Sequence, residues 1–308
     1  MTAFRSLFLL SALALASPVL AQPTKPPPTV DSAFGAYQRG HFLTALKEAN
    51  ELAAKNDPQA MTLIAELYAN GLGVGRDDAK AAQWYQRAAD LGDPQAMFAL
   101  AIFKFSGRGG PVDQAAGVKL FESAAKAGNL FASYNLGLLY LQGQGVPKDL
   151  KRAAELFQTA ARAGVPEAQY ALATLYREGS GVAKDEKRAM QLMQQAAAAG
   201  NLDAMVEFSI AQFNGTDTPK NETAAVKMLT AAARRGSPIA QNRLARILSA
   251  GRGVPANPVE AMKWHIIAKT DGRGDPELDA YMGRQKQEDR TAAEQAAKKW
   301  LATAPRRR

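Results

Sequence analysis

The sequence contains no cysteine among its 308 residues, and its only two histidines are His41 and His265. Without thiols the chain cannot form disulfide bonds, thiolate zinc sites, iron–sulfur clusters or a cysteine nucleophile. Two isolated histidines do not suffice for a multi-histidine metal centre. We therefore expect neither a metal nor a cofactor.

Aromatic residues are also scarce, at 7% of the chain, although 47% of the residues are hydrophobic. Alanine, with 62 residues, accounts for much of the hydrophobic content. Alanine favours helices and lets them pack closely, whereas sheets are rich in aromatic and β-branched residues. The composition predicts an all-α protein with a substantial core, and it argues against a β-sandwich, a barrel or a disordered chain.

Acidic residues are fewer than basic ones, 29 against 38, which gives a formal net charge of +9. The basic residues are spread along the chain, except for Arg306, Arg307 and Arg308 in a basic tail at 305–308. Scattered positive charge is typical of solvated helix faces and favours acidic partners. It lacks the concentrated stripe of a nucleic-acid footprint, so no nucleic-acid partner is expected.

Long hydrophobic runs are missing, apart from a short one near the N-terminus. Arg5 precedes the apolar run Ser6–Ala16, and Val19-Leu20-Ala21 has small residues at the two positions that a signal peptidase reads. The run is far shorter than the ~20 residues that span a bilayer, so residues 1–21 are predicted to be a signal peptide cleaved after Ala21. We expect a periplasmic or secreted protein without an integral membrane span. Residues 22–31, with four prolines, are predicted to be a linker.

A period of 36 residues organises the rest of the chain. The alanine at position 60 and the glycines at positions 71 and 92 each recur at every step of 36 residues, six times in all. A fixed period of this length indicates a repeat architecture. The six units span 58–93, 94–129, 130–165, 166–201, 202–237 and 238–274.

Each unit has the pattern of two helices joined by a glycine-containing loop. In the first unit we predict one helix from about Pro58 to Ala69 and a second from about Asp78 to Leu91. Proline suits the opening of the first helix, and Asp77 is able to cap the second. A glycine after the second helix, such as Gly92, ends it at low conformational cost.

The fourth unit shows the motif most fully, from Ala168 through Leu172 and Tyr176 to Gly179, followed by Asp185, Ala189 and Gly200. Over residues 58–274 this motif resembles the Sel1-like repeat family, relatives of the tetratricopeptide repeats, here with the leader of a secreted bacterial member. The resemblance implies a right-handed α/α superhelical solenoid, in which each hairpin buries its apolar faces on its neighbours. It also implies a tetratricopeptide-like capping hairpin at 32–57 and C-terminal capping helices at 275–304.

Ser123 and Lys126 form the spacing S-x-x-K, which occurs in penicillin-binding enzymes and β-lactamases. The Ser-Asp-Asn and Lys-Thr-Gly partners of that motif are absent from the sequence. His265 shares its column with Tyr85 and Phe121, which favours a packing role. We find no catalytic constellation, and the protein is predicted not to be an enzyme.

The remaining candidate is a binding surface, because solenoids of this kind bind protein segments along an extended concave face. Helical spacing aligns apolar and basic side chains along the first helices of the repeats. The predicted partner-binding residues are Phe98, Ile102, Phe105, Leu138, Leu141, Arg177, Ile210, Phe213, Arg243 and Arg246. An alternative is that the aromatic residues of this stripe belong to the core between repeats.

The leading functional hypothesis is a non-enzymatic, monomeric scaffold or regulator that binds protein or peptide segments of the cell envelope. A sensor-kinase periplasmic domain or a cell-wall assembly factor exemplifies the partner class that the resemblance implies. One alternative is a periplasmic hydrolase of the penicillin-binding or β-lactamase type that uses Ser123 and Lys126. Another is a structural or secretion-associated factor without a fixed partner.

Overall fold

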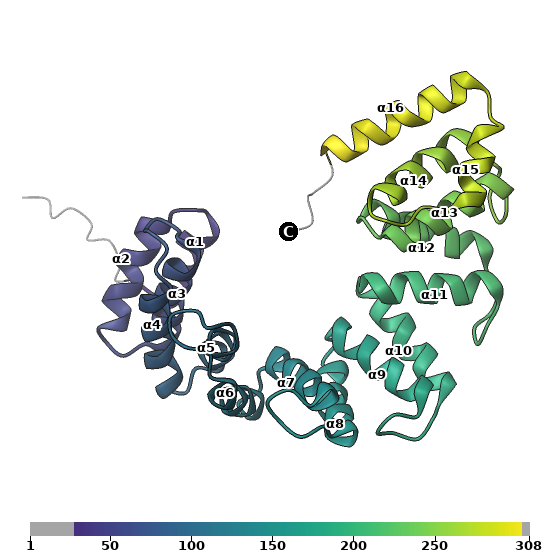
Figure 1. Cartoon of the computed structure of the whole chain (residues 1–308). Coiled ribbons are helices and arrows are strands. Elements are labelled where there is room, and N and C mark those ends of the chain that lie inside the picture. Colours follow the sequence, from purple (N-terminus) through teal and green to yellow (C-terminus); the bar gives the residue numbers. More distant parts are fainter. Residues whose placement is uncertain (1–27, 304–308) are drawn as a thin grey trace, which may run out of the picture.

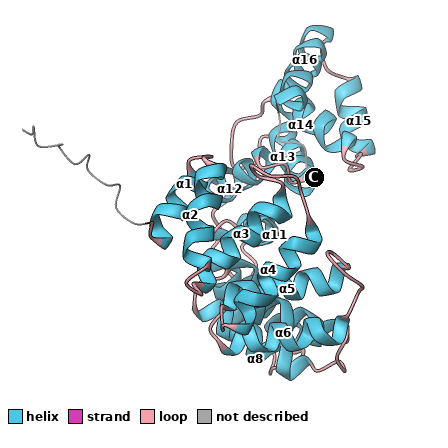
Figure 2. Cartoon of the chain, turned by 90° about the vertical axis from the view of Figure 1, so that its left-hand side faces the viewer, coloured by secondary structure: helices cyan, strands magenta, loops and turns pink. Residues whose placement is uncertain are grey.

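The structure, a computed structural model, describes residues 28–303 and consists there of helices and loops, with no strand (Figures 1 and 2). The chain is therefore all-α over its described length. In chain order the helices are α1 (Val30–Gln38), α2 (Phe42–Ala53), α3 (Pro58–Asn70), α4 (Asp78–Asp90), α5 (Pro94–Ser106), α6 (Gln114–Lys126), α7 (Leu130–Gln142), α8 (Leu150–Arg162), α9 (Pro166–Glu178), α10 (Glu186–Ala198), α11 (Leu202–Asn214), α12 (Glu222–Arg234), α13 (Pro238–Ala250), α14 (Pro258–Thr270), α15 (Pro276–Gly283) and α16 (Gln287–Thr303).

The helices from α3 to α14 form six successive hairpins, one for each 36-residue unit. We call the first helix of each hairpin its A helix and the second its B helix. Each B helix packs against its own A helix and against the A helix of the next hairpin, so that the hairpins stack in sequence order. The result is a solenoid, with α1 and α16 at its opposite ends (Figure 1).

Capping side chains set the helix bounds. Asp57 accepts a hydrogen bond from the amide of Ala60 at the start of α3, and Asp77 accepts one from Lys80 at the start of α4. Gly71 ends α3 in the left-handed conformation, with φ at 67°, which glycine adopts without steric cost. In the fifth repeat Asp217 takes the place of a loop glycine and still has a φ of 56°, so the turn is kept.

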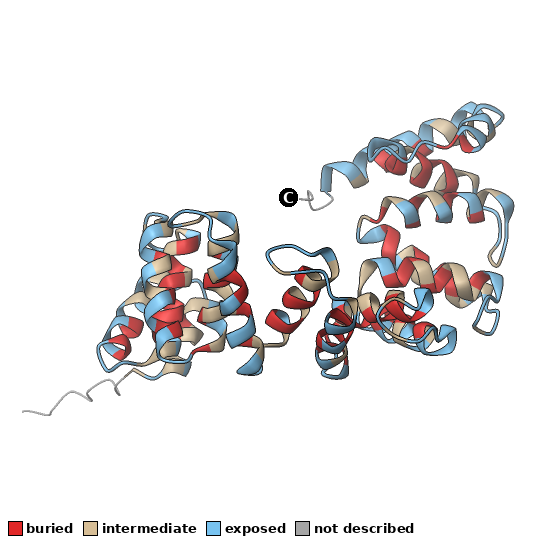
Figure 3. Cartoon of the chain, turned by 60° about the horizontal axis from the view of Figure 1, so that its bottom comes forward, coloured by how far each residue is buried: buried red, intermediate tan, exposed pale blue. Residues whose placement is uncertain are grey.

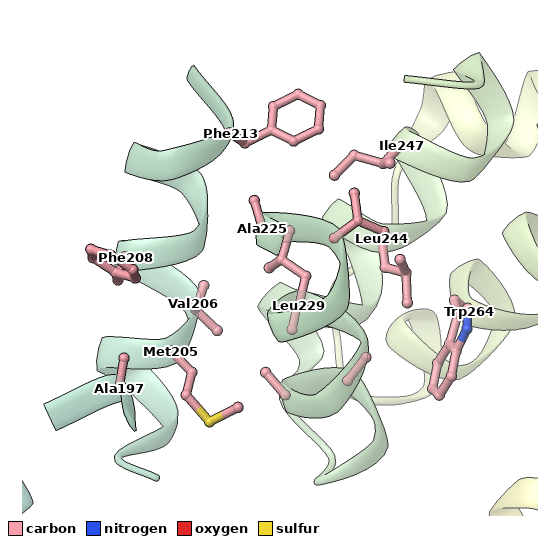
Figure 4. Close-up of a cluster of buried hydrophobic side chains, with 14 of the residues drawn as sticks. Ala197, Met205, Val206, Phe208, Phe213, Ala225, Leu229, Leu244, Ile247 and Trp264 are labelled. Atoms are coloured by element: carbon pink, nitrogen blue, oxygen red, sulfur yellow. The ribbon is translucent and has the colours of Figure 1, made fainter. Parts of the chain in front are cut away.

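The core lies between the helices, along the whole array (Figure 3). Small residues let the backbones approach each other. At Gly137 in α7 an added Cβ would lie 2.6 Å from the ring of Phe157, a side chain with no exposed surface. In the fifth and sixth repeats Phe213 and Ile247 point toward each other above the buried Leu244 and Leu229 (Figure 4).

The N-terminal hairpin begins earlier than the sequence suggested. The linker was predicted to reach residue 31, but α1 starts at Val30. The reason is a capping box, in which Thr29 and Ser32 each accept a hydrogen bond from the other's backbone amide. The predicted signal peptide at 1–21, most of the linker and the basic tail at 305–308 lie outside the described residues.

Two helices follow the last repeat. The longer one, α16, packs against α14, where the rings of Trp264 and Trp300 meet edge to face at 5.9 Å. Ala293 and Ala297 of α16 are buried in this contact. The short helix α15 contacts both α13 and α14. It therefore lies beside the last A helix.

Candidate binding surface

The predicted residues of α5 are partly built into the contact between repeats. The ring of Phe98 lies 5.8 Å from that of Phe121, and the ring of Phe105 stacks on Phe121 at 5.7 Å. Ile102, on the same helix, is 40% exposed. Phe98 and Phe105 are therefore half-buried and pack on the core, and Ile102 is the most exposed of the three.

An apolar patch does extend from α5 to α7. Phe131 at the start of α7 is 55% exposed, and its ring lies 6.3 Å from that of Phe98. We call Phe98, Ile102 and Phe131 the apolar patch. Phe131 was not predicted from the sequence, because its counterparts in three other repeats are Gln95, Glu167 and Asp203.

Leu138 and Leu141 of α7 are half-buried and pack against the core of the third and fourth repeats. They contribute to the stacking of repeats and leave little of their surface for a partner.

Arg177 of α9 is engaged within the protein. Its Nη1 donates a hydrogen bond of 2.6 Å to Oε2 of Glu207 on α11, and the hydroxyl of Tyr170 donates one of 2.6 Å to Oε1. Burial, together with the neighbouring Glu207 carboxylate, raises the pKa of Tyr170 above its usual value. Arg177, which the sequence predicted to bind a partner, thus ties two repeats together.

The other four predicted residues converge. Ile210 and Phe213 of α11 and Arg243 and Arg246 of α13 line one pocket of about 460 Å³. Phe213 is only 6% exposed and forms part of the pocket's apolar floor with Leu229, Ile247 and Leu278. Phe213, which the sequence predicted to bind a partner, is thus a largely buried part of the pocket lining.

Helix α15 forms one wall of this pocket through Glu277, Leu278 and Tyr281, and Arg284 follows it. The loop after α13 adds Arg252, whose guanidinium stacks on the ring of Phe213 at 4.8 Å. The residues of α15 and Arg284 were not predicted from the sequence, because they lie outside the 36-residue period. The place of Arg252 could be read from the sequence, since it lies in the glycine-containing loop that follows α13.

Arg246 and Asp275 hold this wall in place. The carboxylate of Asp275, the N-cap of α15, is buried and accepts hydrogen bonds from Arg246 Nε at 2.5 Å and from Asn242 Nδ2 at 3.0 Å. Burial alone would raise the pKa of Asp275, but the hydrogen bonds from Arg246, Asn242 and the amide of Leu278 outweigh it and lower the pKa. Arg246 also pairs with Glu277 at 3.0 Å, so it is a structural cation as well as a lining residue.

A second pocket, of about 350 Å³, adjoins the first and shares Arg243 and Arg246 with it. Its other lining residues include Ile239, which is 40% exposed, and Arg273. We call the two pockets together the arginine groove. Within residues 28–303, the side chains of Arg243, Arg273 and Arg284 make neither a hydrogen bond nor an ion pair.

The remaining candidates from the sequence do not form a reactive site. Ser123 and Lys126 are both exposed on α6, and no hydrogen bond joins them among the described residues. His265 is 1% exposed, and its Nε2 lies 2.9 Å from Oδ1 of Asp279, which also accepts a hydrogen bond from Lys269. It is a packed side chain that links α14 to α15.

The described part of the chain contains no cluster of histidine, aspartate or glutamate side chains suited to hold a metal ion. Within the same residues, no helix combines the length and the apolar character needed to cross a membrane.

The profile of the Sel1 repeat matches six segments of the chain, residues 58–93, 94–129, 130–165, 166–201, 203–237 and 238–272. The chain is similar to a crystal structure of a Sel1 repeat protein from Oxalobacter formigenes, with 31% identity and a TM-score of 0.74 over 79% of this chain and 100% of that one. It is also similar to c5321, a protective antigen of uropathogenic Escherichia coli that displays the SLR fold, with 26% identity and a TM-score of 0.57 over 89% of this chain and 68% of that one. No curated protein matches the sequence.

Proposed function

Because the chain belongs to the Sel1 repeat family, we propose that it is a non-enzymatic scaffold that binds protein or peptide segments on the surface of its A helices. Its six hairpins stack in sequence order, and in other solenoids such a stack presents an extended binding surface. The leader-like sequence at residues 1–21 supports action in the periplasm or outside the cell, on partners of the cell envelope. The scaffold is proposed to act as a monomer.

The exposed apolar patch carries this proposal. Phe131 is 55% exposed and Ile102 40% exposed beside the half-buried Phe98, and grouped apolar surface marks interaction sites. Ile102 occupies the same position in its repeat as Ile210 and Arg246, which line the arginine groove. The repeat therefore places patch and groove on one side of the array.

Site-specific photo-crosslinking in intact cells tests the proposal. A crosslinking amino acid is placed at position 102 in α5 or at position 131 in α7. The control position is 112, where Val112 is 58% exposed in the loop before α6. We expect positions 102 and 131 to capture the same protein and position 112 not to capture it. Equal capture from all three positions, or none from 102 and 131, would contradict a binding role for the A helices.

A further inference from the structure

We propose that the arginine groove binds an acidic peptide segment that carries an apolar side chain between its carboxylates. The proposal rests on the protein-binding function given above and names the chemistry of the partner at this end of the solenoid. Two features of the groove specify the occupant, namely its charge and its shape.

The charge of the groove is unbalanced. Arg243, Arg246, Arg252 and Arg284 line the first pocket against the single carboxylate of Glu277. Arg246 is committed to Asp275 and Glu277, and Arg252 lies on Phe213. Arg243 and Arg284 are left without a partner in residues 28–303, as is Arg273 in the second pocket. Guanidinium groups pair well with carboxylates, so acidic side chains complement these three positions.

The shape of the groove favours a chain over a small anion. The two pockets meet at Arg243 and Arg246, so an occupant that fills both must cross this pair of side chains. The first pocket has the size of a site for a small ligand, about 300–1,000 Å³, and a floor of aliphatic and aromatic side chains. The exposed Ile239 lies at the second pocket. An extended segment can place an apolar side chain on the floor and carboxylates beside the arginines.

Helix α15 is part of the site. It contributes Leu278 and Tyr281 to the first pocket, and its N-cap, Asp275, lines the second. The bonds from Arg246 and Asn242 to Asp275 hold α15 against α13, so the protein's own contacts form both walls of the groove before a ligand arrives. Such preorganisation lowers the entropic cost of binding.

Fluorescence anisotropy on the mature chain, residues 22–308, tests the proposal. The probe is a short fluorescein-labelled peptide, blocked at both ends, with Leu-Phe at its centre and glutamates on either side. One comparison peptide has glutamine for every glutamate, and a second has serine for Leu-Phe. We expect saturable binding of the first peptide only, weakened by added salt because the arginines are exposed. Absence of binding, or equal binding of all three peptides, would overturn the proposal.

Matched charge reversals locate the binding. The double variant R243E/R284E should reduce affinity about tenfold or more, because two charge pairs are lost and replaced by repulsion. The control R39E/R234E changes the net charge equally, at two exposed arginines outside the groove. If the control weakens binding as much as R243E/R284E does, the peptide responds to overall charge and the proposal fails. The neutral double variant R243Q/R284Q repeats the test without introducing repulsion and should also lower the affinity.

The outcomes for the two proposals can be told apart. Capture of one protein from positions 102 and 131, combined with no effect of R243E/R284E on peptide binding, would leave the scaffold function standing and remove the acidic-peptide site. Failure of the crosslinking while the peptide binds the groove would instead contradict the role of the apolar patch in the scaffold function.

Discussion

Replacing Asp275 by alanine should loosen the C-terminal end of the solenoid. The substitution removes the N-cap of α15, which accepts from the amides of Glu277 and Leu278, and such a cap contributes about 1 kcal/mol. It also removes the acceptor of the half-buried Asn242 amide, for about 1 kcal/mol. Arg246 is 45% exposed, so water replaces its lost partner and the cost there is at most about 0.5 kcal/mol. We expect D275A to lower the free energy of unfolding of this region by about 2 kcal/mol.

Tryptophan fluorescence reports on this region in a W84F background, because the two other tryptophans, Trp264 and Trp300, pack against each other at the C-terminal end. The matched variant is D275N, whose amide oxygen still caps α15. Its NH2 group replaces the oxygen that accepts from Arg246 and Asn242, so the cap is kept while the charge and these two hydrogen bonds are lost. In urea titrations D275N should lose about half as much stability as D275A, because it keeps the cap, which contributes about 1 kcal/mol. A D275A protein within about 0.5 kcal/mol of the parent would refute the role assigned to this carboxylate.

Three further predictions concern packing, pH and catalysis. G137A should lower the melting temperature by about 2–4 °C, because the overlap of the added methyl group with the buried Phe157 ring outweighs the ~1 kcal/mol gained in helix propensity. A higher melting temperature of G137A in a calorimetric scan would contradict the close packing. The pKa of Asp275 is lowered in the folded state, so its charged form stabilises the fold. The difference in free energy of unfolding between wild type and D275N should therefore be largest above about pH 4 and decrease at lower pH. Urea midpoints measured across that range test this, and a difference that stays constant would contradict a role of the charge. Purified protein should not turn over a chromogenic β-lactam, and turnover that disappears in S123A would instead support the hydrolase.

The repeat pattern was enough to predict the hairpins. The first helix was expected from Pro58 to Ala69 and ends one residue later, at Asn70, where Gly71 takes the left-handed conformation. The second was expected from Asp78 to Leu91 and ends at Asp90. These bounds follow from local chemistry, since proline, the capping aspartates and the glycines act within a few residues of their own position.

The binding surface was less predictable, because it depends on contacts between repeats. The spacing i, i+4, i+7 correctly aligned Ile210 and Phe213 on one stripe, but it did not tell the half-buried Ile210 from the core residue Phe213. Nor did it show that Arg177 is held by Glu207 of the next repeat. Helix α15 lies outside the 36-residue period, so no column of the sequence placed Arg284 beside Arg243 in one pocket.

The central claim is that a protein partner lies on the A helices. Amide hydrogen exchange of residues 22–308, measured with and without the protein captured from position 102, tests it most directly. We expect slower exchange in α5 and α7, and also in α13 and α15 if the partner reaches the arginine groove, while the B helices stay unchanged. Protection confined to the B helices from α4 to α14 would contradict the claim.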